Sequence, residues 1–89
     1  MKQHYDIIIH GKVQNVGFRY YTQKKANELQ INGFVKNQSD GSVYIEAEGD
    51  EKELQAFLLW CHRGPQWARV DNVTANPAPI AGYNGFTVQ

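Results

Sequence analysis

The chain has 89 residues, a length that suits one small domain. Hydrophobic residues make up 42% of it and charged residues 20%, proportions that exclude intrinsic disorder. Nine basic residues balance nine acidic ones, so no overall field attracts nucleic acid, and any site for an anion has to be local.

Cysteine content and hydropathy indicate the compartment. Cys61 is the only cysteine, so an internal disulfide is impossible, which is typical of a reducing environment. No apolar run approaches the roughly 18 residues that span a bilayer, and the N-terminal segment lacks the apolar core of a secretory signal. We therefore expect a cytoplasmic protein that does not contact membranes.

The first half of the chain changes its hydrophobic period twice. Residues 5–10 contain three consecutive isoleucines and are predicted to form a buried strand. Residues 11–17 hold two glycines and an asparagine, which predicts a loop. From Phe18 onward apolar residues recur at helical spacing, and this helix should end near Gln30, because residues that form helices poorly follow.

Two further strands are predicted around a turn. Residues 33–37 form the first, and residues 39–41, Ser-Asp-Gly, form a tight turn. Residues 42–48 alternate between apolar and polar side chains, as expected for a strand with one buried face. The polar side chains of this strand are Tyr44, Glu46 and Glu48.

A second helix is predicted to begin after Asp50. Asp50 and Glu53 have the spacing of a capping box, in which the Asp50 carboxylate accepts a hydrogen bond from the Glu53 backbone N–H. Apolar residues then follow at i, i+3, i+4 and i+7, and residues 64–65, Gly-Pro, end the helix.

The remaining segments complete the predicted fold. Residues 67–73 should form a fourth strand, residues 76–79 a loop and residues 86–89 a short extra C-terminal strand. The resulting order, βαββαβ, predicts one α+β domain over residues 1–89, a ferredoxin-like sandwich with a mostly antiparallel sheet and two helices on one face. A right-handed crossover makes the first two strands parallel, with room for the third between them.

This topology brings the loop at residues 11–17 beside the end of the second strand. The loop leads into a helix N-terminus, where backbone N–H groups and the helix dipole favour an anion. Arg19 adds a permanent cation whose donor fork matches two phosphate oxygens, and Asn37 carries an amide that can orient water. From spacing alone, an ordinary loop with a surface arginine and a turn asparagine remain open interpretations.

A family resemblance resolves these alternatives. The run from Gly11 to Arg19, GKVQNVGFR, resembles the acylphosphatase signature Gly-x-Val-Gln-Gly-Val-Gly-Phe-Arg. The stretch from Gly33 to Asn37, followed by residues 40–43, resembles the family's second motif, and further similarity extends to the final strand. The resemblance therefore covers essentially the whole chain.

The resemblance implies hydrolysis of the carboxyl-phosphate anhydride bond of acyl phosphates, without metal or cofactor. It assigns phosphate binding to Arg19 and positioning of the attacking water to Asn37. The backbone amides assigned to the phosphate cradle are those of Gln14, Asn15, Val16, Gly17 and Phe18. A small acyl phosphate is the expected partner of a monomer that binds no nucleic acid.

Two positions depart from the family pattern. Asn15 stands where the family usually has glycine; if the position needs a positive φ, asparagine is the least costly replacement, at about 1 kcal/mol. Gln30 stands where a glycine often ends the first helix. Asn15 is therefore expected to affect the rate more than the type of reaction.

Other sites and function classes fit the residues less well. Cys61 is interpreted as a core cysteine, because a thiol phosphatase needs an exposed thiolate and an arginine six residues later. The three histidines show no metal-ligand spacing. RNA-recognition domains share the topology, but Glu46 and Glu48 would repel phosphates. An inactive or weakly active acyl-phosphate-binding module, or a relative of the acylphosphatase-like domain of hydrogenase maturation proteins, is the main alternative to an enzyme.

Overall fold

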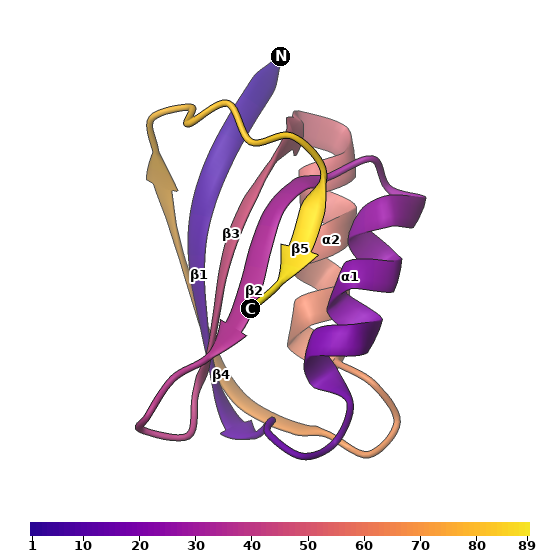
Figure 1. Cartoon of the computed structure of the whole chain (residues 1–89), viewed down its shortest axis with the longest axis vertical. Coiled ribbons are helices and arrows are strands. Elements are labelled where there is room, and N and C mark those ends of the chain that lie inside the picture. The colour runs from indigo at the N-terminus through magenta and orange to yellow at the C-terminus, as the bar shows by residue number, and fades with distance from the viewer.

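A five-stranded sheet carries two helices on one face (Figure 1). The computed structural model describes all residues, 1–89. In chain order the elements are β1 (Lys2–Lys12), α1 (Phe18–Glu28), β2 (Asn32–Asn37), β3 (Val43–Asp50), α2 (Glu51–Arg63), β4 (Arg69–Ala78) and β5 (Phe86–Val88). The predicted α+β fold is confirmed.

The strand order is β4-β1-β3-β2-β5. β1 pairs antiparallel with β3 and β4, and β3 pairs antiparallel with β2, so β1 and β2 run parallel on either side of β3, as predicted. β5 lies parallel to β2, with Val88 opposite Val35, which makes the sheet mixed. Because β1 and β2 point the same way, the loop after β1 and the end of β2 lie at one edge of the sheet (Figure 1).

The hydrophobic core fills the space between the sheet and the helices. Alternation along β1 and β3 directs one set of side chains toward the helices. α1 and α2 each pack a stripe of apolar side chains against the sheet. Burial of each large side chain contributes about 1.5–3 kcal/mol. The largest are Ile7, Ile9, Phe18, Ile31, Ile45, Leu54 and Phe57. Neither helix has the length and apolar composition that a membrane crossing requires.

The fourth strand differs from its prediction. Residues 76–78, predicted as a loop, belong to β4, which pairs with β1 as far as Ala78 opposite His4. Pro77 is tolerated there because β4 is an edge strand, where a missing backbone N–H interrupts no second ladder. β1 is correspondingly longer than predicted and begins at Lys2.

The predicted capping box at the start of α2 is wrong. Asp50 is the N-cap residue, but its side chain makes no capping hydrogen bond. Asp50 is also the last residue of β3, paired with Lys2, so the chain passes from strand to helix without a turn. The backbone N–H of Glu51 donates instead to the carbonyl oxygen of Met1, at 3.2 Å. The carbonyl oxygen of Met1 thus satisfies the first N–H of α2, which is a different donor from the Glu53 N–H of the predicted capping box.

Candidate active site

A bulge at the end of β1 directs the chain into the loop. The pairing of β1 with β4 shifts between His10 and Gly11. Gly11 has φ 134°, and a Cβ there would lie 2.1 Å from the backbone oxygen of Arg69. Only glycine allows this close approach, so Gly11 makes possible the bulge that precedes the loop.

The loop ends in a helix N-terminus whose donors are free. Gly17 is the N-cap of α1 and has a left-handed conformation, with φ 77° and no side-chain cap. None of the backbone N–H groups from Gln14 to Phe18 donates a hydrogen bond to another residue. The first turn of α1 contains no acidic residue. These main-chain donors, at the positive end of the helix dipole, are available to an anion.

The two non-glycine residues with positive φ are the two that depart from the family pattern. Asn15 has φ 62° and Gln30, after the end of α1, has φ 58°. Both side chains are exposed. Position 15 therefore does have a positive φ, and its asparagine carries the backbone cost that a glycine would avoid.

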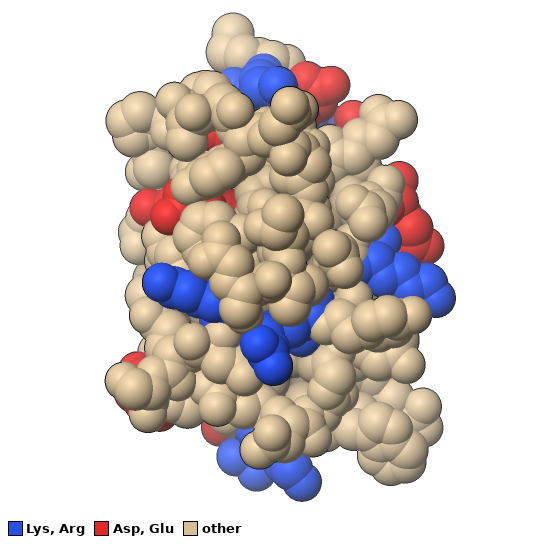
Figure 2. Space-filling model, in the orientation of Figure 1, with Lys and Arg blue, Asp and Glu red and all other residues tan.

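Arg19 lies in the first turn of α1 and reaches toward the end of the sheet. Its Nη1 donates to the backbone oxygen of Gln89 at 2.9 Å, and no other residue accepts from its guanidinium. Together with Asn15 and Gly17 it lines a cavity of about 320 Å³. Basic side chains form a band across the middle of the face shown in Figure 2. Arg19 thus places a positive charge at this cavity although the net charge of the chain is zero.

Asn37 is the last residue of β2, opposite Val43. Its Oδ1 is buried and receives no hydrogen bond from the chain. Buried side-chain oxygens in folded proteins nearly always have a donor, so this acceptor is suited to a molecule that enters the site.

Two separate contacts connect the loop and helix to the end of β2. Gln14 Nε2 donates to the carbonyl oxygens of Gln38 and Ser42, at 2.8 and 2.9 Å. On the other side, the Gln89 backbone that accepts from Arg19 donates its own N–H to Val35 of β2, at 2.8 Å. The predicted residues thus gather at one end of the sheet, where β1 and β2 finish, although no direct contact joins Arg19 to Asn37.

A larger cavity, of about 590 Å³, lies beyond Tyr21 between the ends of the two helices. Arg63 is its only charged lining residue, and none of the predicted site residues lines it. Cys61 also takes no part in a site: it is fully buried, and burial raises the pKa of its thiol. The prediction of a core cysteine is confirmed.

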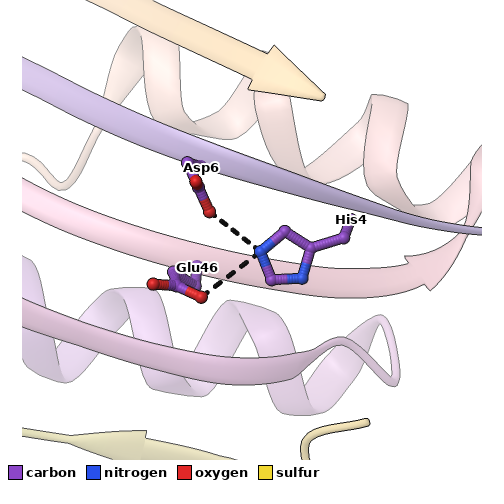
Figure 3. A group of neighbouring side chains, drawn as sticks. All are labelled: His4, Asp6 and Glu46. Atoms are coloured by element: carbon purple, nitrogen blue, oxygen red, sulfur yellow. Dashed lines mark hydrogen bonds and ion pairs between the residues drawn. The ribbon is translucent and has the colours of Figure 1, made fainter. Parts of the chain in front are cut away.

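A second polar cluster, which the sequence analysis missed, lies on the face of the sheet without helices. His4 Nε2 lies 2.8 Å from Asp6 Oδ1 and 3.3 Å from Glu46 Oε1 (Figure 3). His4 Nδ1 lies 2.8 Å from Glu48 Oε2. The signal was present in the alternation: His4 pairs with Glu48 and Asp6 with Glu46, which places all four on one face.

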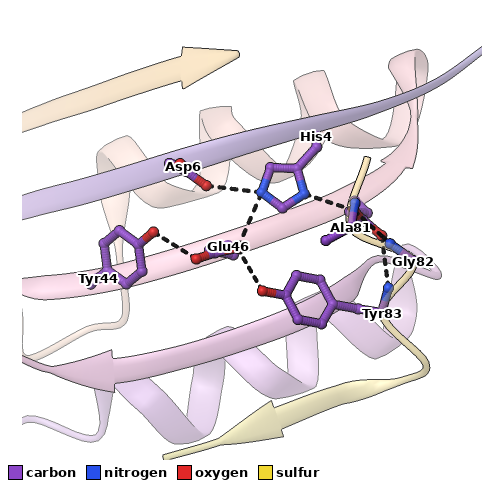
Figure 4. A network of polar contacts seen from close by, with 8 residues as sticks. His4, Asp6, Tyr44, Glu46, Ala81, Gly82 and Tyr83 are labelled. Atoms are coloured by element: carbon purple, nitrogen blue, oxygen red, sulfur yellow. Dashed lines mark hydrogen bonds and ion pairs between the residues drawn. The ribbon is translucent and has the colours of Figure 1, made fainter. Parts of the chain in front are cut away.

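Glu48 also anchors the segment before β5. Its carboxylate accepts hydrogen bonds from the backbone N–H groups of Ala81, Gly82 and Tyr83 (Figure 4). Burial opposes its ionisation, but the N–H of Ala81, the His4 imidazole and the other two N–H groups outweigh it and lower the Glu48 pKa to about 2. Glu48, expected on a polar face, is therefore buried as a carboxylate.

The pKa of His4 shifts in the opposite direction from that of Glu48. Burial alone would lower its pKa, but the carboxylates of Glu48 and Asp6 outweigh burial and raise it above the ordinary value. Glu46 accepts hydrogen bonds from the hydroxyls of Tyr44 and Tyr83, at 2.7 and 2.6 Å. The cluster is thus a nearly closed network that ties β1, β3 and the segment before β5 together.

The fold is that of a small ferredoxin-like domain, in which unpaired backbone N–H groups lie at the N-terminus of α1. A family model of acylphosphatases matches residues 5–88. The acylphosphatase of Mannheimia succiniciproducens is 55% identical over 69 residues, which cover 78% of this chain and 77% of the relative. That of a Synechococcus species is 43% identical over 89 residues, which cover 100% and 99% of the two chains. The chain belongs to the acylphosphatase family.

Solved structures agree with this assignment. The acylphosphatase of Bacillus subtilis superposes with a TM-score of 0.95 at 37% identity, covering 100% of this chain and 99% of that one. Full-length HypF, solved in a phosphate- and nucleotide-bound form, contains a similar domain, with a TM-score of 0.89 at 28% identity. This chain corresponds to 12% of HypF.

Proposed function

We propose that the chain hydrolyses acyl phosphates to a carboxylate and inorganic phosphate, with the phosphoryl group held by Arg19 and the backbone N–H groups of residues 14–18. The observation that carries this proposal is the set of unpaired main-chain donors at the start of α1, beside a guanidinium with one partner. Such donors match the charge and shape of a phosphoryl group.

We assign the positioning of the attacking water to Asn37. Its buried Oδ1 lacks a donor, so it is suited to accept a hydrogen bond from water and to aim the water oxygen at phosphorus. The new bond forms between that oxygen and phosphorus while the bond from phosphorus to the carboxyl oxygen breaks. The electron pair leaves with the carboxylate, and the water protons pass to the phosphate product and solvent.

The chemistry suits a site without a general acid. A carboxylate leaves without being protonated, so what remains is to hold the phosphoryl group, neutralise its charge and align the water. Arg19, the loop donors and Asn37 supply these three functions.

The assembly and location are part of the same proposal. The buried apolar residues form one core cluster, which supports a single domain over residues 1–89. We propose that this domain acts as a monomer. A lone buried cysteine supports a reducing, cytoplasmic location.

The alternative is a module that binds acyl phosphate without turnover, which the presence of a similar domain inside HypF makes worth testing. Benzoyl phosphate hydrolysis with excess EDTA separates the two. If the chain is an enzyme, we expect turnover that EDTA does not abolish and that Arg19→Ala reduces by at least ~10²-fold. Phosphate binding without turnover in the wild type would favour the module.

A further inference from the structure

We propose that His4, Asp6 and Glu46 form a binding site for a divalent transition-metal cation, with Zn²⁺ as the probe, on the helix-free face of the sheet. The ligand atoms are His4 Nε2, Asp6 Oδ1 and Glu46 Oε1, which all lie within 4.8 Å of one another. Figure 3 shows the imidazole facing both carboxylates. This site is separate from the proposed hydrolytic site.

The spacing of the two carboxylate oxygens from His4 Nε2 suits a common ion. Zinc binds imidazole nitrogen and carboxylate oxygen at about 2.0–2.2 Å, so two neighbouring ligand atoms are about 3.0–3.4 Å apart. The two distances from His4 Nε2, 2.8 and 3.3 Å, require adjustments of only a few tenths of an ångström. One imidazole with two carboxylates is a donor set for zinc or manganese rather than for magnesium or calcium, which prefer oxygen alone.

Glu48, the partner of His4 Nδ1, determines which tautomer the imidazole adopts. Glu48 already accepts three backbone N–H groups and lies 2.8 Å from His4 Nδ1, so the hydrogen on that side belongs to Nδ1. A neutral ring then points the Nε2 lone pair at the two remaining carboxylates. Only a proton or a cation on Nε2 makes that arrangement favourable, and the carboxylate–histidine–cation order is the usual one in metal sites.

The surroundings support the same ion. Three carboxylates surround one imidazole, so even a charged ring leaves an excess of negative charge for a divalent cation to neutralise (Figure 4). The hydroxyls of Tyr44 and Tyr83 hold Glu46 in place. The side chains of Asp6 and Glu46 are 39% and 20% exposed, which gives an ion a path from solvent and room for water ligands.

The site lies far from the proposed hydrolytic chemistry. His4 and Lys12 are at opposite ends of β1, roughly 25 Å apart at the rise of an extended strand. A bound cation would therefore link β1 and β3 near the segment that precedes β5, without contact with the phosphoryl group. On binding, the ion takes the place of any proton on Nε2, which is released to solvent.

Titration calorimetry of chelator-stripped protein with Zn²⁺ tests the proposal. We expect one ion per chain, and at least ~10-fold weaker binding in Asp6→Asn and in Glu46→Gln, since even outer-shell changes commonly cost that much. His10→Gln and His62→Gln, which change exposed histidines, are the matched controls and should leave the affinity unchanged. Mg²⁺ should give no comparable binding.

Nitrogen-15 NMR of histidine-labelled wild type provides a readout that needs no variant. Zn²⁺ should shift Nε2 of His4 and leave the resonances of His10 and His62 in place. Absence of saturable binding, equal affinity in Asp6→Asn, or a zinc shift at the exposed histidines instead would each overturn the proposal.

Discussion

Gln14 and Gln38 are joined across the candidate site: the Gln14 Nε2 lies 2.8 Å from the carbonyl oxygen of Gln38. The same nitrogen also reaches the carbonyl oxygen of Ser42, at 2.9 Å. Gln38 directly follows Asn37, so one side chain of the loop sets the distance between the free N–H groups and the proposed water-positioning amide.

Loss of this bridge should reduce both turnover and stability. Gln14→Ala removes two hydrogen bonds, a loss of about 1–2 kcal/mol in the free energy of unfolding. We expect kcat for benzoyl phosphate to fall at least ~10-fold, because a small misplacement of reacting groups is costly. Urea unfolding and steady-state kinetics measure the two effects.

The matched control is Gln38→Ala, which keeps the backbone carbonyl and loses only a bond from Gln38 Nε2 to the Ser42 hydroxyl. It should reduce kcat much less. Equal losses in the two variants would mean that the bridge does not position the site.

Relief of backbone strain at the loop should stabilise the protein. Asn15→Gly removes a left-handed asparagine with φ 62°, and we expect a gain of about 1 kcal/mol in unfolding free energy with activity kept or raised. Gln30→Gly, at φ 58° and outside the site, should give a similar gain and leave kcat unchanged. A large loss of activity in Asn15→Gly would show that its side chain takes part in the reaction.

Acid stability should depend on Glu48. Its folded-state pKa of about 2 lies below the ordinary value of 4.5, so ionised Glu48 stabilises the fold above pH 4.5. That contribution, roughly 3 kcal/mol, is lost as the pH falls through 4.5 to about 2. In urea unfolding with EDTA present, Glu48→Gln should therefore have a lower free energy of unfolding than the wild type at pH 7. This difference should shrink as the pH falls toward 2.

A control variant and the pH dependence of His4 complete the test of the Glu48 charge. Glu28→Gln, which changes an exposed glutamate of α1, should follow the wild-type curve. His4 acts in the opposite sense: its raised pKa stabilises the fold below pH 6.5, and this contribution is lost as the pH rises through the raised value. A pH-independent deficit in Glu48→Gln would contradict the role of its charge.

The sequence predicted those features that local periodicity or the family motif encodes. The isoleucine run, the apolar stripe of α2 and the loop before Phe18 each appeared where expected, and the crossover rule gave the order of β1, β3 and β2. The position of Arg19 at the start of α1 followed from the same local signals.

Features that depend on distant pairing were missed. Residues 76–78 form a strand only because β1 is long enough to pair with them. Glu48 is buried because the segment at residues 81–83 folds over it, and no local pattern connects residues more than thirty positions apart. The bridge from Gln14 to Gln38 likewise needed coordinates, since either glutamine alone is consistent with a surface residue.

In the proposed mechanism, Arg19 holds the phosphoryl group and Asn37 positions the attacking water. Steady-state hydrolysis of benzoyl phosphate, with inorganic phosphate as competitive inhibitor, tests it in wild type, Arg19→Ala and Asn37→Ala. We predict that Arg19→Ala weakens phosphate inhibition and lowers kcat/KM by at least ~10²-fold, whereas Asn37→Ala lowers kcat by about 10²–10³-fold and leaves phosphate inhibition unchanged. Wild-type turnover in either variant, or loss of phosphate inhibition in Asn37→Ala alone, would contradict the account.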